Sequence, residues 1–336
     1  MTSAVVLSIL ESSQVGEARR LAVTLARQIG FNETERGKIG IIVTEAANNL
    51  VRHAQEGLLI LQAISKHNRL GIEILALDKG PGIQNISECL RDGFSSTGTS
   101  GNGLGAIRRL STLFEIYSVP ELGTALLSQL WTGLSTNPKE KLELGAIGVP
   151  IADESVSGDA WASCQSIDRS VLLVVDGLGH GAMAAAAAEA AVRVFREQVH
   201  LSPKAIIEVA HAALQRTRGA ALAIAEINFA QQTVRFAGIG NISGTVFSIT
   251  GTSRMVSHNG TVGHEVRKIQ EFTYPWHPTG ILIMHSDGLS SRWQLDRYPG
   301  LAAKHCSLIA GVLYRDCKRH RDDVTVLVAR EETASC

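Results

Sequence analysis

The stretch that decides the fold of this chain's second half reads Val174-Val175-Asp176-Gly177-Leu178-Gly179-His180-Gly181. The apolar residues 171–175 predict a buried strand, and Asp176 stands where that strand ends in a glycine-rich turn. Residues 182–199 follow; they are rich in alanine but interrupted by charge, which predicts a buried helix rather than a membrane span. The stretch therefore predicts a strand that delivers a carboxylate to a turn in front of a helix.

Three further acids stand next to strands in the same half of the chain. Asp159 follows a Ser-Gly turn, Asp287 follows a predicted strand, and Asp322 directly precedes one. Aspartate is a common turn former, so any one of these acids alone indicates little. Together with Asp176 they predict a centre that holds two divalent ions roughly 3.5–4 Å apart, where a bridging water becomes hydroxide. Ligands that are all oxygen favour Mg²⁺ or Mn²⁺ over zinc.

Strands dominate this half of the chain, and a pair of helices interrupts them. The helices are expected at 182–199 and 205–214. The strands are expected at 142–149, 161–166, 171–175, 221–228, 233–237, 244–249, 269–273, 281–285 and 324–328. This order predicts a β-sandwich flanked by helices.

The acidic motifs of this half resemble the SpoIIE branch of the metal-dependent type 2C protein phosphatases. The motifs are Ser157-Gly158-Asp159, the stretch at 174–181, Ser286-Asp287-Gly288 and Arg321-Asp322-Asp323-Val324-Thr325. Within that branch, Arg218-Gly219-Ala220 and residues 236–242 are similar to the RsbX-type feedback phosphatases of the stressosome. The resemblance extends from about residue 142 to residue 330.

The resemblance implies a role for each acid. Asp176 would bridge both metals, the Gly177 carbonyl would ligate one, and Asp159 would act on the reaction through the first metal. Asp287 and Asp322 would hold the second metal, although the adjacent acid at 323 remains an alternative to Asp322. The phosphate-binding arginine of many relatives has no clear counterpart here. His180 is interpreted as a surface turn residue, with proton donation as the alternative.

The first half presents a different set of polar residues. Glu45, Asn49 and His53 are spaced four apart, so that they project from one face of a helix predicted to begin after Asn32. On that face Glu45 is suited to act as a general base, and Asn49 can offer its carbonyl to Mg²⁺. The spacing therefore predicts an acid and an amide that act together one helical turn apart. His53 is interpreted as structural.

Two glycine-rich turns complete this set. Asp78 closes an apolar strand and opens the turn Asp78-Lys79-Gly80-Pro81-Gly82, where a carboxylate can accept a hydrogen bond from an amine such as that of adenine. In Gly101-Asn102-Gly103-Leu104-Gly105, the glycines let the backbone approach phosphates closely, and a helix around 106–110 follows. Each piece alone is weak, but their order and spacing predict a nucleotide site.

These motifs resemble the GHKL ATPase superfamily, and more narrowly the RsbT-type switch serine kinases. The narrower similarity lies in Gly80-Pro81-Gly82-Ile83, Leu90-Arg91-Asp92-Gly93-Phe94, Gly103-Leu104-Gly105, Arg108-Arg109-Leu110 and Gly123-Thr124. It implies that Glu45 is the catalytic base, Asn49 the Mg²⁺ ligand and Asp78 the acid that reads adenine. Residues 101–105 would form the phosphate-binding lid, and Thr124 would lie behind the adenine.

The remaining periodicity of the first half indicates an α/β sandwich. A strand is expected at 5–9, helices at 15–29 and 32–50, and further strands at 58–64, 70–77, 114–119 and 124–131. The polar, turn-rich segment from Thr132 onward lacks periodicity and predicts a linker at 132–141. We therefore expect an α+β chain of two domains: a GHKL ATPase domain at 1–131 and a phosphatase domain at 142–330.

Composition limits where the protein acts and what it binds. The formal net charge is +0, which gives no field toward nucleic acid or an anionic membrane. Five scattered cysteines without CxxC spacing indicate reduced thiols, and the N-terminus lacks the pattern of a signal peptide. The sequence therefore predicts a cytoplasmic protein, and it allows a homodimer.

Three hypotheses for function follow. In the first, the chain uses ATP and Mg²⁺ to phosphorylate a serine or threonine of a STAS-domain partner and removes that phosphate at the two-metal centre. In the second, only the phosphatase is an enzyme, and the first half is an ATP- and partner-binding module. In the third, the protein is a scaffold that works by sequestration, a role that leaves the acidic cluster without a purpose.

Overall fold

The structure is a computed structural model that describes residues 4–66, 69–90, 103–133, 140–152, 154–249 and 251–332. The chain divides into two compact units, each of which draws on two segments of the sequence. Unit 1 is Met1–Pro138 together with Leu295–Arg315, and unit 2 is Lys139–Gln294 together with Asp316–Cys336. Both units combine sheets with helices, so the expected α+β, two-domain fold class is confirmed. Among the described residues, no helix has the length and apolar character needed to cross a membrane.

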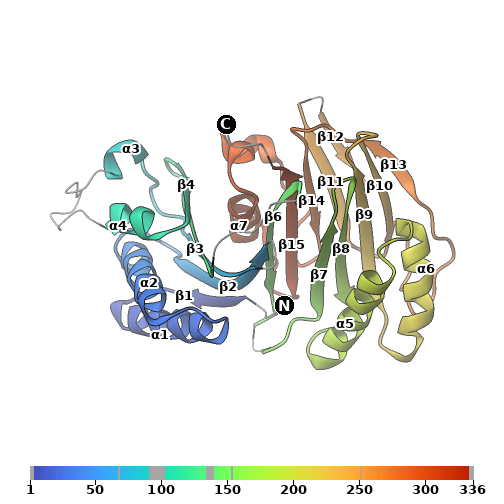
Figure 1. Cartoon of the computed structure of the whole chain (residues 1–336), viewed down its shortest axis with the longest axis horizontal. Coiled ribbons are helices and arrows are strands. Elements are labelled where there is room, and N and C mark those ends of the chain that lie inside the picture. Colours follow the sequence, from blue (N-terminus) through green and yellow to red (C-terminus); the bar gives the residue numbers. More distant parts are fainter. Residues whose placement is uncertain are drawn as a thin grey trace. The chain divides into compact units, whose positions relative to one another are not determined.

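Unit 1 contains one antiparallel sheet with the strand order β1-β2-β3-β5-β4. Its strands are Val5–Ser8, Leu58–Lys66, Arg69–Leu77, Leu113–Val119 and Gly123–Trp131 for β1 to β5. The helices α1 (Ser12–Gln28) and α2 (Glu33–His53) cover one face of this sheet (Figure 1). Asn32 caps α2 as expected, because its side chain accepts the Glu35 N–H at 2.9 Å.

Side chains alternate across the sheet of unit 1, and this alternation defines two different faces. Ile72, Ile74 and Ala76 of β3 join the apolar core beneath α1 and α2. The intervening residues Glu73 and Leu75 therefore point to the opposite face. Two short helices, α3 (Ile86–Cys89) and α4 (Gly103–Leu110), complete the first segment of the unit.

Unit 2 is a sandwich of two five-stranded antiparallel sheets, ordered β13-β10-β9-β8-β7 and β12-β11-β14-β15-β6. An apolar core that includes Leu172, Phe236 and Leu327 draws on strands of both sheets. The strands are β6 Leu142–Val149, β7 Asp159–Gln165, β8 Arg169–Gly177, β9 Ala220–Asn228, β10 Thr233–Ile239, β11 Ser243–Ser248, β12 Gly251–Arg254, β13 Phe272–Pro275, β14 Ile281–His285 and β15 Val324–Glu331.

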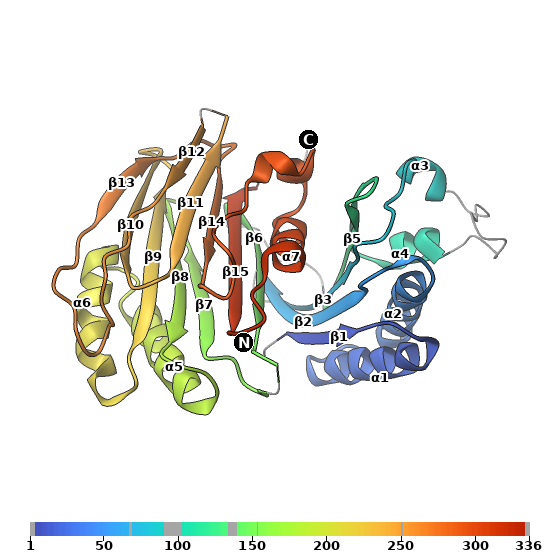
Figure 2. The same cartoon turned by 180° about the vertical axis from the view of Figure 1, so that it is seen from behind.

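Two helices cover the outer face of the β7–β10 sheet (Figure 2). They are α5 (Ala182–Glu197) and α6 (Pro203–Ala213), and a second apolar core that includes Phe195 and Ile207 lies beneath them. Short 3₁₀ turns occupy Leu214–Arg216, Leu295–Arg297 and Leu301–Ala303. The β-sandwich with flanking helices that the sequence predicts for this half is therefore present.

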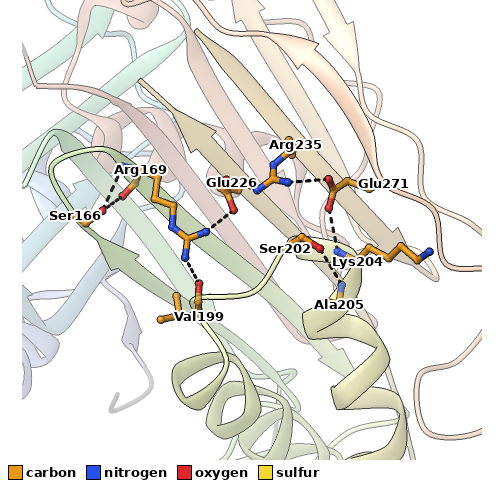
Figure 3. A network of polar contacts seen from close by, with 9 residues as sticks. All are labelled: Ser166, Arg169, Val199, Ser202, Lys204, Ala205, Glu226, Arg235 and Glu271. Atoms are coloured by element: carbon orange, nitrogen blue, oxygen red, sulfur yellow. Dashed lines mark hydrogen bonds and ion pairs between the residues drawn. The ribbon is translucent and has the colours of Figure 1, made fainter. Parts of the chain in front are cut away.

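A charged network fixes the connection between α5 and α6 to the sheet (Figure 3). Glu226 on β9 is only 2% exposed and accepts hydrogen bonds from Arg169 at 2.9 Å and Arg235 at 2.6 Å. Arg169 also donates to the Val199 carbonyl in the α5–α6 connection at 2.8 Å. Because Glu226 is buried between two guanidinium groups, its charge is compensated where it would otherwise be costly.

The helix α7 (Cys306–Cys317) is the main element that the sequence did not predict. The segment Leu295–Arg315 lies in sequence within the expected phosphatase domain at 142–330, but by its packing it belongs to unit 1. Every residue from Cys306 to Arg315 is buried. A helix buried on all sides shows no amphipathic stripe, which is why its sequence pattern is uninformative.

Candidate functional sites

The four predicted metal-binding acids gather at one end of the sandwich in unit 2. Asp159 begins β7 and lies directly opposite Asp176, near the end of β8, in the antiparallel ladder. Asp287 follows β14 and Asp322 precedes β15, two strands that are also paired. The two sheets thus each contribute two acids, which is the convergence that the sequence predicted.

Ser286 connects the two pairs of acids. Its hydroxyl donates to Asp159 Oδ2 at 2.5 Å and accepts the Thr325 N–H at 2.9 Å. The Ser286 N–H also donates to the Thr325 carbonyl at 3.0 Å, so the loop that carries Asp287 is fixed to the start of β15. Ser286 therefore holds acids from both sheets at a fixed spacing.

The structure separates the roles of the adjacent acids 322 and 323. Asp323 is 2% exposed and accepts the N–H groups of Ile151 and Gly158, each at 2.8 Å. Both of its carboxylate oxygens therefore accept hydrogen bonds from the backbone. Asp322 is half-buried, and the one hydrogen bond that it receives from the described residues comes from the Asp323 N–H, at 3.0 Å. This difference favours Asp322 as the metal ligand, as the family resemblance implied.

Burial and mutual repulsion of the acids raise the free energy of the folded cluster when no cation is bound. Burial raises the pKa of Asp176, and the neighbouring Asp159 and Asp287 raise it further. The pKa of Asp159 is also raised, first by burial, against the opposing hydrogen bond from Ser286. Burial and then Asp287 raise the pKa of Asp322. Ionised carboxylates packed this closely need positive charge between them.

Buried oxygen atoms without hydrogen-bond partners also indicate that this cluster binds cations. Within the described part of the chain, Asp159 Oδ1 and Asp287 Oδ1 are buried and accept no hydrogen bond, as expected of oxygens that bind a metal. Among the described residues, no three His, Cys, Asp or Glu side chains converge closely enough to enclose a single ion. Mg²⁺ commonly takes one or two carboxylates and completes its shell with water. The donor set therefore fits hydrated, oxygen-ligated ions.

Three neighbours of the acids were not among the predicted site residues. Asn241 donates through Nδ2 to Asp287 Oδ2 at 2.8 Å and so orients that carboxylate. Ser286 has the bridging position described above. Glu154 accepts a contact from His180 Nδ1 at 2.7 Å at the exposed rim. Only Asn241 and Ser286 carried a signal, because both lie inside motifs quoted for the family resemblance.

Gly177 lies where no side chain fits. A Cβ on this residue would come within 2.1 Å of the Ala184 carbonyl oxygen in α5. The end of β8 is therefore pressed against the first turn of α5, which fixes the backbone next to Asp176. This close packing is the physical reason for glycine directly after the acid.

In unit 1, α2 and the start of α4 bring the predicted catalytic residues together. Glu45 and Asn49 are half-buried on the same face of α2. A Cβ on Gly103, the first residue of α4, would lie 2.9 Å from Glu45 Oε2 and 3.8 Å from Asn49 Oδ1. The helix therefore begins against both side chains, and its N-terminal N–H groups add partial positive charge there.

The other predicted lid residues differ in their placement. Leu104 packs against the apolar core of unit 1, and Gly105 is buried. Both belong to α4, which begins three residues earlier than the sequence predicted. Gly101 lies outside the described residues.

Asp78 is held by the backbone on both sides of the turn that it opens. Its Oδ1 accepts the N–H of Gly80 at 2.6 Å and that of Thr124 at 3.3 Å. The Thr124 hydroxyl lies 2.9 Å from the Ser118 hydroxyl. Burial raises the pKa of Asp78, opposed by these backbone hydrogen bonds and by the charges of Arg315 and His53.

Glycines allow the chain to pass close to Asp78. Gly82 has φ +73°, and a Cβ there would come within 2.3 Å of the Val119 carbonyl oxygen. Gly123 has φ +83°, and its Cβ would approach the Asp78 carbonyl oxygen to 2.0 Å. A Cβ on Gly80 would collide with the carbonyl of His53 at 2.4 Å. The three glycines thus let the Asp78 turn pack against β4, β5 and the end of α2.

Comparison with known families matches each half separately. The histidine kinase-like ATPase domain family matches residues 10–128, and the Stage II sporulation protein E (SpoIIE) family matches residues 166–332. The serine/threonine-protein kinase RsbT of Bacillus subtilis (strain 168) is 32% identical over 114 residues, which are 34% of this chain and 86% of RsbT. The phosphoserine phosphatase RsbX of the same organism is 26% identical over 138 residues, 41% of this chain and 69% of RsbX.

Two solved structures are similar to part of this chain. A structure from work on the bacterial stressosome matches with a TM-score of 0.54 at 28% identity, over 57% of this chain and all (100%) of that one. A crystal structure of RsbX in complex with magnesium has a TM-score of 0.51 at 21% identity, over 58% of this chain and 98% of RsbX. Through its first half this chain therefore belongs to the RsbT-like histidine kinase-like ATPases, and to this half is fused a second half that matches the SpoIIE family and is similar to RsbX.

Proposed function

We propose that this chain is a cytoplasmic, bifunctional partner-switching regulator that phosphorylates a serine or threonine of a STAS-domain protein and also removes such a phosphate. The phosphatase part of the proposal is carried by the buried oxygens of Asp159 and Asp287 that lack hydrogen-bond partners, together with the pKa of Asp176, which burial and the neighbouring acids raise. The placement of Glu45 and Asn49 against the start of α4 supports the kinase part.

For the phosphatase, the cluster in unit 2 would hold two Mn²⁺ or Mg²⁺ ions. The carboxylates of Asp159, Asp176, Asp287 and Asp322 and the Gly177 carbonyl would hold these ions, with water completing each coordination shell. When bound, such ions supply a water of lowered pKa and neutralise phosphate charge. Ser286 and Asn241 would keep the carboxylates of Asp159 and Asp287 oriented, because each donates a hydrogen bond to one of them.

For the kinase, unit 1 would bind ATP with Mg²⁺. Asp78 would accept the adenine amine, and Asn49 would contribute its carbonyl oxygen to the metal. When bound, the nucleotide supplies the phosphoryl group, and positioning with charge neutralisation is most of what the transfer requires. Glu45 would take the proton of the acceptor hydroxyl, since its carboxylate faces the first turn of α4.

The test is transfer of phosphate from labelled ATP to a purified STAS-domain protein, with wild type compared with Asp176→Asn. If both units act on one site, the label accumulates far more in the variant, because removal is lost while transfer continues. Asp168→Asn is the matched control, since this exposed aspartate lies in the turn at the far end of the same β7–β8 hairpin.

A second comparison separates the kinase from a binding module. Glu45→Gln is expected to abolish label transfer while the variant still binds ATP and the STAS-domain protein. Glu17→Gln, an exposed position on α1, should behave as wild type. If wild type and Asp176→Asn both leave a panel of STAS-domain proteins unlabelled while binding ATP, the kinase proposal is wrong and unit 1 is a regulatory module.

A further inference from the structure

The segment Leu295–Arg315 covers the face of the unit 1 sheet that α1 and α2 leave bare. A Cβ on Gly311 of α7 would lie 3.2 Å from Leu77 and 3.7 Å from Leu75, two β3 residues of that face. Both views show α7 beside β3 on the side away from α1 and α2 (Figures 1 and 2). Unit 1 is therefore a three-layer structure whose third layer comes from a distant part of the sequence.

A buried carboxylate fixes one end of this helix. Glu73 on β3 is 1% exposed and accepts hydrogen bonds from Gln62 at 2.7 Å and Gln129 at 2.6 Å, both on neighbouring strands. Its third donor is the Ser307 hydroxyl of α7, at 2.7 Å. A buried carboxylate short of a donor is costly, so this contact specifies where α7 sits along the strand.

A second carboxylate holds the chain just before α7. Glu115 on β4 accepts the His305 N–H at 2.6 Å and pairs with Lys304 at 3.6 Å. The start of α7 is thus attached to β4 as well as to β3. The first turn of α7 and the residues just before it are therefore held by two strands, β3 and β4.

The last turn of α7 reaches the proposed nucleotide site. Arg315 is 3% exposed, and its Nη1 donates to the Asp78 carbonyl at 2.7 Å. The side chain of Asp78 is held from its other side by the N–H groups of Gly80 and Thr124. Arg315 thus donates a hydrogen bond to the backbone of Asp78, and its charge also lowers the pKa of the Asp78 carboxyl.

We propose that Arg315 is a positioning residue of the nucleotide site, which makes ATP binding by unit 1 dependent on a helix encoded within the phosphatase half of the sequence. The inference rests on the proposed role of Asp78 in adenine recognition. A charge-assisted hydrogen bond to the carbonyl fixes the backbone of Asp78, and a displaced backbone would aim the carboxylate away from the adenine amine. Arg315 lies outside residues 10–128, which match the ATPase family, and none of the motifs quoted for the phosphatase resemblance contains it.

The segment that contains α7 lies in sequence between the two acids proposed for the second metal. In unit 2, Ser290 N–H donates to the Cys317 carbonyl at 2.9 Å, and Arg319 N–H donates to the Gly288 carbonyl at 2.7 Å. The segment therefore starts and ends at backbone fixed between Asp287 and Asp322, the two acids proposed for the second metal. The end of α7 is thus continuous with the backbone that lies next to these two acids.

The test measures binding of fluorescently labelled ATP and GTP, with Mg²⁺, to the full chain. Arg315→Met is expected to weaken ATP binding about tenfold while changing GTP binding little, so that the preference for adenine falls. Arg315→Lys retains a charged donor and should stay within about threefold of wild type. The matched control is Arg292→Met, because this exposed arginine lies outside the segment. A variant that merely unfolds unit 1 would lose both nucleotides together, and circular dichroism would reveal it.

The variant Asp78→Asn distinguishes the two ways in which the idea can fail. If wild type binds no ATP, or if Asp78→Asn retains the full ATP preference, the proposed nucleotide site is wrong and the inference falls with it. If Asp78→Asn loses the preference while folded Arg315→Met and Arg315→Lys both keep it, the inference alone is overturned. Loss of the preference in Asp78→Asn and Arg315→Met, with recovery in Arg315→Lys, is the expected result.

Discussion

Replacing Asp176 with asparagine is predicted to stabilise unit 2 when no metal is bound. Burial and the neighbouring Asp159 raise the pKa of Asp176 from 3.8 to about 9. The folded protein therefore retains a proton at pH 7.5 that the unfolded chain has released. A raised pKa of this kind leaves stability intact below pH 3.8 and removes it progressively up to about pH 9.

The size of the effect follows from the same shift. From 3.8 to pH 7.5 is 3.7 pH units, and at about 1.4 kcal/mol per unit the cost reaches about 5 kcal/mol. Asp159 faces Asp176 across the ladder and shares this cost. Asp176→Asn should therefore recover about half, about 2–3 kcal/mol, which corresponds to roughly 5–10 °C in the melting temperature of a domain this size.

The assay is thermal unfolding with EDTA, followed by the same experiment with excess Mn²⁺. Asp176→Asn should melt above wild type in EDTA at pH 7.5, and the difference should shrink at pH 5.5, where the unfolded chain gains less by ionising. With Mn²⁺ the order should reverse, because only wild type retains the full ligand set. A variant that melts below wild type in EDTA, or a difference that does not depend on pH, would refute the reasoning.

Three further substitutions test other parts of the two sites. Asp323→Ala should cost about 3 kcal/mol with or without Mn²⁺, because two backbone N–H groups lose their acceptor; a melting loss confined to the metal-bound form would contradict this. Asn241→Ala should weaken Mn²⁺ binding about tenfold in a calorimetric titration, with stability in EDTA unchanged, since Asn241 orients Asp287. Gly123→Ala should abolish binding of labelled ATP, because its Cβ would lie 2.0 Å from the Asp78 carbonyl oxygen; unchanged affinity would separate that turn from the nucleotide site.

Local signals made much of this fold predictable. Two kinds of prediction rested on residues that are near one another in sequence. One was the helix cap at Asn32, and the other was the strands that precede Asp78 and Asp176. The structure confirms these predictions: Asn32 caps its helix by accepting the Glu35 N–H, and β3 and β8 end at or next to Asp78 and Asp176. The convergence of the four acids was predictable for a related reason, since each acid flanks a strand and paired strands bring their ends together.

What the sequence did not reveal depends on long-range contacts. Ser307 and Glu73 are 234 residues apart, and neither stands in a recognisable motif. Helix α7 has no polar face because every side of it is covered, so periodicity gave no sign of its partner. The family resemblance implied Asp322 rather than Asp323, but the two residues alone left both open, because their difference depends on the N–H groups of Ile151 and Gly158 from another part of the chain.

The third layer of unit 1 also affects the order in which the protein can fold during synthesis. The sheet strands of unit 1 leave the ribosome first. Glu73 and Asp78 can form their hydrogen bonds to Ser307 and Arg315 only later, because those residues are 234 and 237 positions further along the chain. Contacts this distant in sequence form slowly because a long loop must close. A nascent chain therefore exposes the apolar β3 face while most of unit 2 is being made. In this protein the ATPase half begins first and is completed nearly last, which places its final assembly after translation of the phosphatase strands β6 to β14.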